Sequence, residues 1–207
     1  MIKLSKFDKI FLGTIFGFIP PILLLLLGGW ISILFVAENK IIMFLISGFI
    51  FGIFIDVLFL RKWINIGYKL NNYILIVIYI FYSICIFGFF MGVPVVNIFM
   101  GVIAGIYIAR RIINRKLEKR EIKNKVMITS IFSAIIILFF SISSAYLALK
   151  DPYTAANLEG MFNLSINVTL EMIIGLIIVG GLLLVLFQYL ITKKTSMFIL
   201  RKGKYFT

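Results

Sequence analysis

The stretch SGFIFGIFIDVLFLRKW, residues 47–63, carries one carboxylate, Asp56, inside an apolar run long enough to cross a bilayer. An ionised carboxylate is costly at membrane depth, and such residues face a bundle interior or a water-filled path. Arg61 and Lys62 follow at about 140° and 240° around a helix, so neither naturally covers Asp56. The carboxylate is therefore either protonated or paired with a cation from another segment.

Two explanations of Asp56 stay open. Arg110 and Arg111 end a later apolar run at a similar expected depth, and a long basic side chain can bend to reach a partner. A pair between Asp56 and either arginine would fix the register of two helices. The alternative is a place in a solute or ion path, since an ionisable residue within the membrane is a candidate site by default.

Asn97 and Glu171 are the other candidates for a ligand or ion path. Asn97 lies one turn past the corner formed by Gly92 to Pro94, where a buried amide more commonly bonds a neighbouring helix. Glu171 stands at the edge of the last apolar run, so a small shift of that run makes it a solvated boundary residue. Asp56 and Glu171 are expected near opposite membrane faces, too far apart to form a catalytic pair of carboxylates.

Several glycines share a helix face with these three polar residues at four-residue spacings: Gly48, Gly52, Gly101, Gly105 and Gly175. The favoured explanation is helix packing, because glycines four residues apart let helix backbones approach closely in membranes. The alternative is that the strips of glycine and polar residues line a path through the bundle.

Catalytic chemistry is disfavoured by the residues that the chain lacks. It has no histidine and a single cysteine, Cys85, which lies in an apolar run without a neighbouring base. An intrachain disulfide, a Cys/His metal site and histidine acid–base catalysis are thus excluded. We expect no enzyme activity, no metal and no cofactor.

The composition places all of these residues in a membrane protein. Apolar residues make up 62% of the 207, charged residues only 14%, and the mean hydropathy is +1.14. We predict an all-α polytopic membrane protein with six transmembrane helices in a single domain over residues 1–207. The predicted spans are residues 10–36, 41–60, 73–91, 94–109, 127–148 and 168–191.

The basic residues predict the orientation. With the N-terminus inside, 19 of the 21 lysines and arginines fall in cytoplasmic segments, eight of them in the loop 110–125. We therefore predict a multi-pass protein of the cell (cytoplasmic) membrane with both termini cytoplasmic. The net charge of +13 lies at span ends, which favours anionic inner-leaflet lipids over nucleic acid as its partner. The loop 110–125 is either an ordinary topology determinant, which we favour, or a short amphipathic helix on the inner leaflet.

Two further features concern the shape of single segments. Pro20 and Pro21 fall in the middle of the first span and predict a tilt or kink there. The extracytoplasmic loop 150–165 begins with the turn residues Asp151 and Pro152 and continues with YTAANLEGMF, which can form two helical turns.

Two functions fit this sequence. The first is a small-solute or ion transport component, either a binding subunit or an oligomeric pore, with Asp56, Asn97 and Glu171 along its path. The second is a structural or accessory subunit that packs against a partner membrane protein, or against its own copies, through the glycine faces. A closed cavity reached by Asp56 or Asn97 would favour the first, and an exposed glycine face would favour the second.

Overall fold

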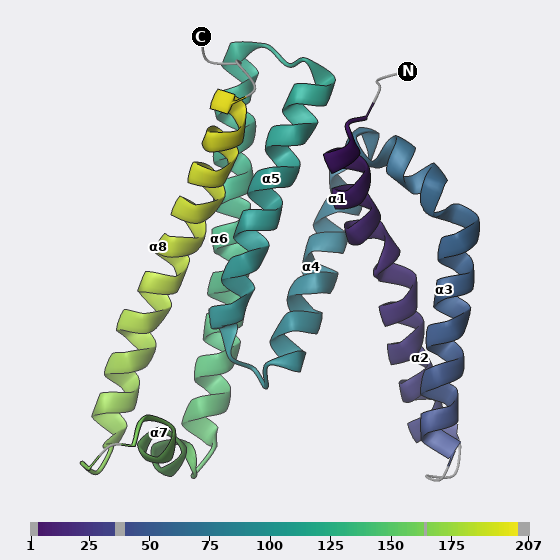
Figure 1. The fold of residues 1–207 in the computed structure, drawn as a ribbon. Helices are drawn as coiled ribbons and strands as arrows, with labels where there is room; N and C mark the ends of the chain where they lie inside the picture. The colour runs from purple at the N-terminus through teal and green to yellow at the C-terminus, as the bar shows by residue number, and fades with distance from the viewer. Residues whose placement is uncertain (1–3, 36–39, 164, 203–207) are drawn as a thin grey trace. The chain divides into compact units, whose positions relative to one another are not determined.

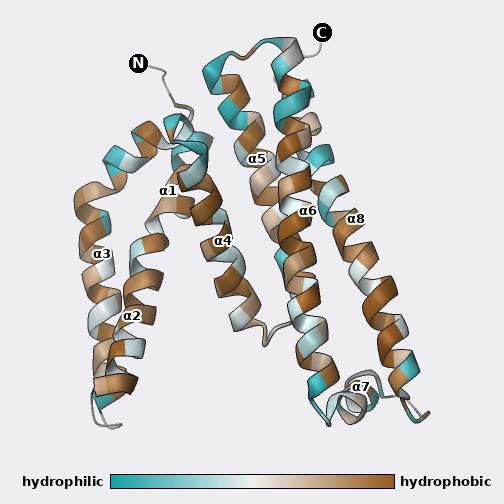
Figure 2. Ribbon diagram, turned by 180° about the vertical axis from the view of Figure 1, so that it is seen from behind, coloured by the Kyte–Doolittle hydropathy of each residue, from teal (hydrophilic) through white to brown (hydrophobic). Residues whose placement is uncertain are grey.

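The computed structural model describes residues 4–35, 40–163 and 165–202, and these residues are helical with no strands (Figure 1). Six helical segments in this part of the chain are long and apolar enough to span a membrane, which confirms the predicted fold class. Hydrophobic residues run along the length of the helices (Figure 2), as a lipid environment requires. The cytoplasmic placement of both termini stays a prediction.

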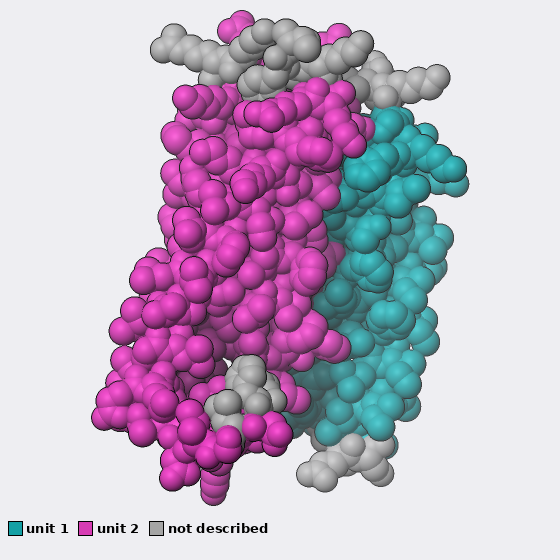
Figure 3. All heavy atoms as spheres, turned by 60° about the vertical axis from the view of Figure 1, so that its left-hand side comes forward, with its two compact units in different colours: residues 1–70 teal, residues 71–207 magenta. Residues whose placement is uncertain are grey.

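The chain divides into two compact units, residues 1–70 and 71–207, which Figure 3 draws in two colours. Each unit is described by itself. The first unit contains the helices α1 (Lys6–Gly17), α2 (Ile19–Phe35) and α3 (Ile41–Ile66), followed by the 3-10 turn η2 (Gly67–Lys69).

The first span is broken between α1 and α2. Helix α1 ends at Gly17, Phe18 is a turn residue, and α2 starts at Ile19 and carries Pro20 and Pro21 in its first turn. Prolines lack a backbone N–H and clash with the carbonyl four residues earlier, which is Phe16 for the first proline and Gly17 for the second. The bend expected from the two prolines therefore falls just before them.

Helices α2 and α3 approach closely because glycines stand where they meet. A Cβ added at Gly28 would lie 2.6 Å from the carbonyl oxygen of Phe44. One added at Gly48 would collide with the carbonyl of Leu24, and one at Gly52 with the backbone of Pro21. Only glycine allows this backbone-to-backbone contact, which gains van der Waals packing in the membrane.

The start of α1 is fixed to η2 by a second carboxylate of this unit, Asp8. Ser5 caps α1, and Asp8 returns the interaction by accepting from the Ser5 backbone N–H at 3.1 Å and from its hydroxyl at 2.6 Å. The Tyr68 hydroxyl donates to the other Asp8 oxygen at 2.8 Å. Asp8 is buried with hydrogen bonds to both of its oxygens.

The second unit is a bundle of longer helices. It contains α4 (Asn72–Phe89), the 3-10 turn η3 (Pro94–Asn97), α5 (Ile98–Arg115), α6 (Lys119–Lys150), α7 (Thr154–Phe162) and α8 (Leu170–Lys202). Helices α5, α6 and α8 pack along one another, and α4 joins them through the corner at Met91 and Gly92, which have positive φ angles. Helix α7 matches the helical turns expected from YTAANLEGMF.

Residues 110–125 differ from the predicted basic loop. Helix α5 continues to Arg115 and α6 begins at Lys119, so only residues 116–118 connect them. No separate amphipathic helix lies in this described stretch; its apolar residues instead join a core shared by α5, α6 and α8. That core contains the fully buried Ile112, Ile122 and Leu200. The end of the unit where α5 and α8 finish and α6 begins is called its basic end below.

Candidate functional site

Asp56 lies on α3 in the first unit and faces the α1–α2 break. Its Oδ2 is 3.8 Å from the position that a Cβ on Gly17 would occupy, and its side chain is only 9% exposed. Its Oδ1 is buried and has no hydrogen-bond partner among the residues that the structure describes. This carboxylate is thus enclosed beside the end of α1, and no described residue donates a hydrogen bond to its Oδ1.

The break leaves backbone carbonyls without their usual helical donors. Helix α1 ends at Gly17, and Pro20 and Pro21 have no N–H to offer the carbonyls of Phe16 and Gly17. Helix α2 begins at Ile19, so the negative pole of α1 and the positive pole of α2 meet at the break and largely offset one another. Asp56 and the break together bring a carboxylate close to the end of α1, and carboxylates and backbone carbonyls are the groups with which the broken helices of transporters hold ions.

The predicted partners of Asp56 lie in the other unit. The Arg111 guanidinium is mostly buried and donates to the Asn72 side-chain oxygen at 2.7 Å, which ties the end of α5 to the start of α4. A pair of Asp56 with Arg110 or Arg111 would connect the two units, and it stays a prediction.

Asn97 begins a polar column in the second unit. Its side-chain N–H donates to the Ser83 carbonyl at 3.2 Å, so the amide bonds a neighbouring helix. One turn along α4, the Gln188 side chain of α8 donates to the Tyr79 hydroxyl at 3.0 Å. Three buried oxygens in these two layers have no partner among the described residues: Asn97 Oδ1, Ser83 Oγ and Gln188 Oε1.

The column continues toward the basic end through hydroxyl groups. The hydroxyls of Ser133 on α6 and Thr192 on α8 are 2.8 Å apart, and that of Thr192 also donates to the Gln188 carbonyl at 2.9 Å. One turn further, the Ser196 hydroxyl donates to the Gly105 carbonyl of α5 at 3.2 Å. These side chains are completely buried, so a continuous polar strip runs inside the bundle.

Gly101 and Gly105 make room for this strip. A Cβ on Gly101 would lie 2.9 Å from the Thr192 hydroxyl oxygen and 3.0 Å from the Gln188 side chain. A Cβ on Gly105 would lie 2.8 Å from the Thr192 carbonyl oxygen. The glycines that let α5 approach α8 closely therefore stand beside the polar strip, and a path along this strip stays a prediction.

Gln188, Thr192, Ser196 and Ser133 were not predicted as site residues. A signal for the first three was present in the sequence, because they are spaced by four residues and thus share one face of a helix. The last predicted span ended at residue 191, so Thr192 and Ser196 were expected to lie in the tail. In the structure α8 continues as one helix to Lys202.

Glu171 and Gly175 lie apart from this column. Glu171 is exposed in the first turn of α8, as expected for a boundary residue. Gly175 was predicted as a packing position, but an added Cβ would meet no described atom within 4 Å. The reason is that the first part of α8 has its surface largely exposed, so within this chain the glycine packs against nothing described.

No family model, no curated protein and no solved structure matches this chain. Its function is therefore argued from the geometry of the two units.

Proposed function

We propose that this integral membrane protein is a component for the transport of an ion or small solute, acting as a binding subunit or an oligomeric pore without catalytic chemistry. The observation that carries the proposal is Asp56, a buried carboxylate with an unpartnered oxygen at a helix break. An ionisable group kept in such a position has a large energetic cost, which a bound proton or cation relieves.

The polar column of the second unit supports the same proposal. A buried polar atom left without a hydrogen bond costs about 1–3 kcal/mol. Asn97, Ser83 and Gln188 each contribute one such oxygen in adjacent layers of the bundle. Three acceptor oxygens gathered inside a membrane bundle are suited to water, to a cation or to the donor groups of a polar solute.

The test is native mass spectrometry of the protein released gently from its own membrane. We expect a co-purifying cation or small molecule on the wild-type protein and its loss on Asp56→Asn, which keeps the shape of the side chain and removes its charge. Glu171→Gln is the matched control, because it removes the charge of an exposed carboxylate, and it should keep the ligand. A ligand retained equally by both variants would contradict a site at Asp56.

A second candidate function is that of an accessory subunit. The observation that favours it is a set of open glycines on α8: no described atom lies within 4 Å of an added Cβ at Gly175, Gly180 or Gly181. Glycines on an exposed membrane helix permit close approach of another helix. In the same spectra, a stoichiometric protein partner without a small ligand would support this function and contradict the first.

The location that we propose is the cytoplasmic membrane, with both termini and the basic end of the second unit in the cytoplasm. The support is the distribution of lysine and arginine, since Lys123, Lys193 and Arg201 all lie at one end of that unit.

A further inference from the structure

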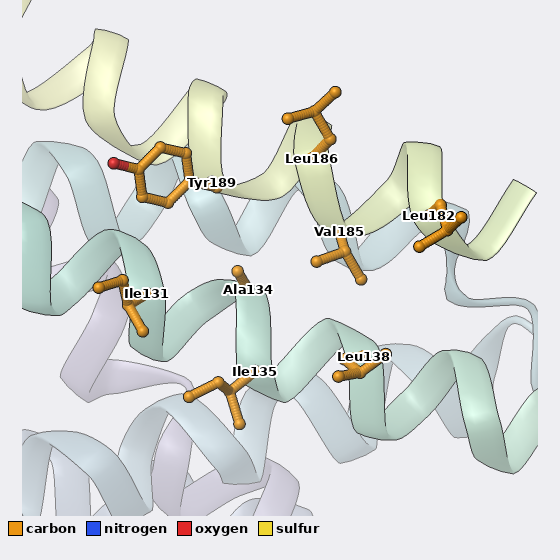
Figure 4. Close-up of a pocket in the computed structure, with 8 residues that line it drawn as sticks. All are labelled: Ile131, Ala134, Ile135, Leu138, Leu182, Val185, Leu186 and Tyr189. Carbon is orange, nitrogen blue, oxygen red and sulfur yellow. The ribbon is translucent and has the colours of Figure 1, made fainter.

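A groove of about 340 Å³ lies between α6 and α8 in the second unit (Figure 4). Helix α6 contributes Ile131, Ala134, Ile135 and Leu138, and α8 contributes Leu182, Val185, Leu186 and Tyr189. Seven of these eight side chains are purely hydrocarbon. The groove is open along one side, so it faces whatever surrounds the bundle at this depth.

The two ends of the groove differ, because the Tyr189 hydroxyl, the polar group among its lining side chains, lies at one end. Leu182 and Tyr189 are seven residues apart, which is about 10 Å along a helix. Tyr189 lies on the side of the basic end, and the opposite end is aliphatic. A length of about 10 Å fits within one leaflet, whose hydrocarbon is about 15 Å thick.

A cation stands directly beyond the polar end. The Lys193 ammonium donates to the Tyr189 hydroxyl at 3.3 Å and lies 4 residues further along the same face of α8. Lys193 is exposed, so its charge is available to a ligand. Lys194, the next residue, is also exposed but lies about 100° further around the helix, away from the groove face.

We propose that this groove holds one acyl chain of an anionic phospholipid, with its phosphate bound by Lys193 and Tyr189. The aliphatic wall matches the chain, the hydroxyl and ammonium match the phosphate, and their order along α8 matches the order of these groups in a lipid. A second copy of this chain fits less well on the face. A two-fold axis along the membrane normal would bring its Lys193 to the same depth, where like charges repel.

The test uses the full-length protein in nanodiscs of phosphatidylcholine and phosphatidylglycerol in equal amounts. Native mass spectrometry then counts the lipids that stay bound after the disc is removed. We expect the wild-type protein to retain phosphatidylglycerol over phosphatidylcholine, and Lys193→Gln to lower that preference several-fold. Lys194→Gln, which removes the same charge on another face, should keep it.

A second pair of variants tests the apolar wall. Val185→Trp fills the groove and should lower the number of bound lipids, whereas Leu183→Trp places the same side chain on an exposed part of α8 about 160° around the helix from Val185, outside the groove. The proposal is overturned if both lysine variants lose the preference equally, if neither does, or if Val185→Trp retains as much lipid as Leu183→Trp. A dimer that Val185→Trp dissociates would also overturn it, since a second copy would then occupy the face.

Discussion

Asp8 and Asp56 are two buried carboxylates of one unit with opposite surroundings. Both oxygens of Asp8 accept hydrogen bonds, from Ser5 and from Tyr68. Asp56 has a buried oxygen without a partner among the described residues. A satisfied carboxylate stabilises the fold that surrounds it, whereas an unsatisfied one destabilises it and is retained for another reason.

This contrast predicts opposite effects of the same substitution. Asp8→Leu should lower the free energy of unfolding by about 2–3 kcal/mol, because it removes a helix cap and the carboxylate that accepts the hydrogen bond of the Tyr68 hydroxyl. Asp56→Leu should leave stability unchanged or raise it while abolishing ligand binding. Thermal unfolding in detergent, followed by the fluorescence of Trp30 and Trp63, measures both.

The same measurement decides between the two explanations of Asp56. If Asp56 instead forms a buried pair with Arg110 or Arg111, its removal would strand that cation and cost about 3–5 kcal/mol. A large loss of stability in Asp56→Leu would therefore favour the structural pair over the ion site.

The glycines of the two units give a second prediction at the residue scale. Gly48→Ala should destabilise the protein by about 1–3 kcal/mol, because its Cβ would collide with the Leu24 carbonyl where the backbone cannot yield. Gly175→Ala should be neutral or slightly stabilising, because its surroundings are open and alanine favours a helix by about 1 kcal/mol. Melting temperatures of the two variants in the same detergent compare them, and equal losses would contradict the packing difference.

At the scale of elements, the connection between α5 and α6 depends on one strained residue. Lys116 caps α5 with φ 52° and ψ 47°, the left-handed conformation that costs a residue with a Cβ about 1–2 kcal/mol. Lys116→Gly should therefore raise the free energy of unfolding by up to about 1 kcal/mol. Lys123→Gly, inside α6, removes the same charge and should lower it by a similar amount. A loss of stability in Lys116→Gly would show that its side chain contributes more than its backbone costs.

The six spans could be predicted from the sequence because each requires only length and apolar composition. The break near Pro20 and Pro21 could also be predicted, since proline acts through the local backbone. The ends of the helices could not be predicted in this way. A span predicted from hydropathy ends where the side chains become polar, but α5 continues through Arg110 and Arg111 because its apolar face still packs against α6 and α8.

The candidate sites also differ in whether a local sequence signal reveals them. Asp56 could be found from sequence because a charge in an apolar run is a local signal. The polar column could not be assembled in that way, because it depends on which faces of four helices meet. Tyr79, Gln188 and Ser133 come from three separate helices, and only the packing of those helices brings them together.

At the scale of the whole molecule, the proposals share one requirement, which is the orientation in the membrane. If the basic end of the second unit faces the cytoplasm, Lys193 meets the leaflet that carries anionic lipids, and α7 lies on the outside. The reverse orientation would place the four basic residues at this end of α6 and the four of α8 against the leaflet that lacks anionic lipids, which forgoes about 1 kcal/mol for each charge near the surface.

This requirement predicts the accessibility of two exposed residues. In a background of Cys85→Ser, which leaves no other thiol, Asn157→Cys on α7 should react in intact cells with a membrane-impermeant maleimide. Lys123→Cys, at the basic end of α6, should react only with a permeant reagent or after the cells are opened. The two variants control for each other, because each carries one thiol on an exposed helical surface. The opposite pattern would invert the topology and, with it, the side from which an ion reaches Asp56 and a lipid reaches Lys193.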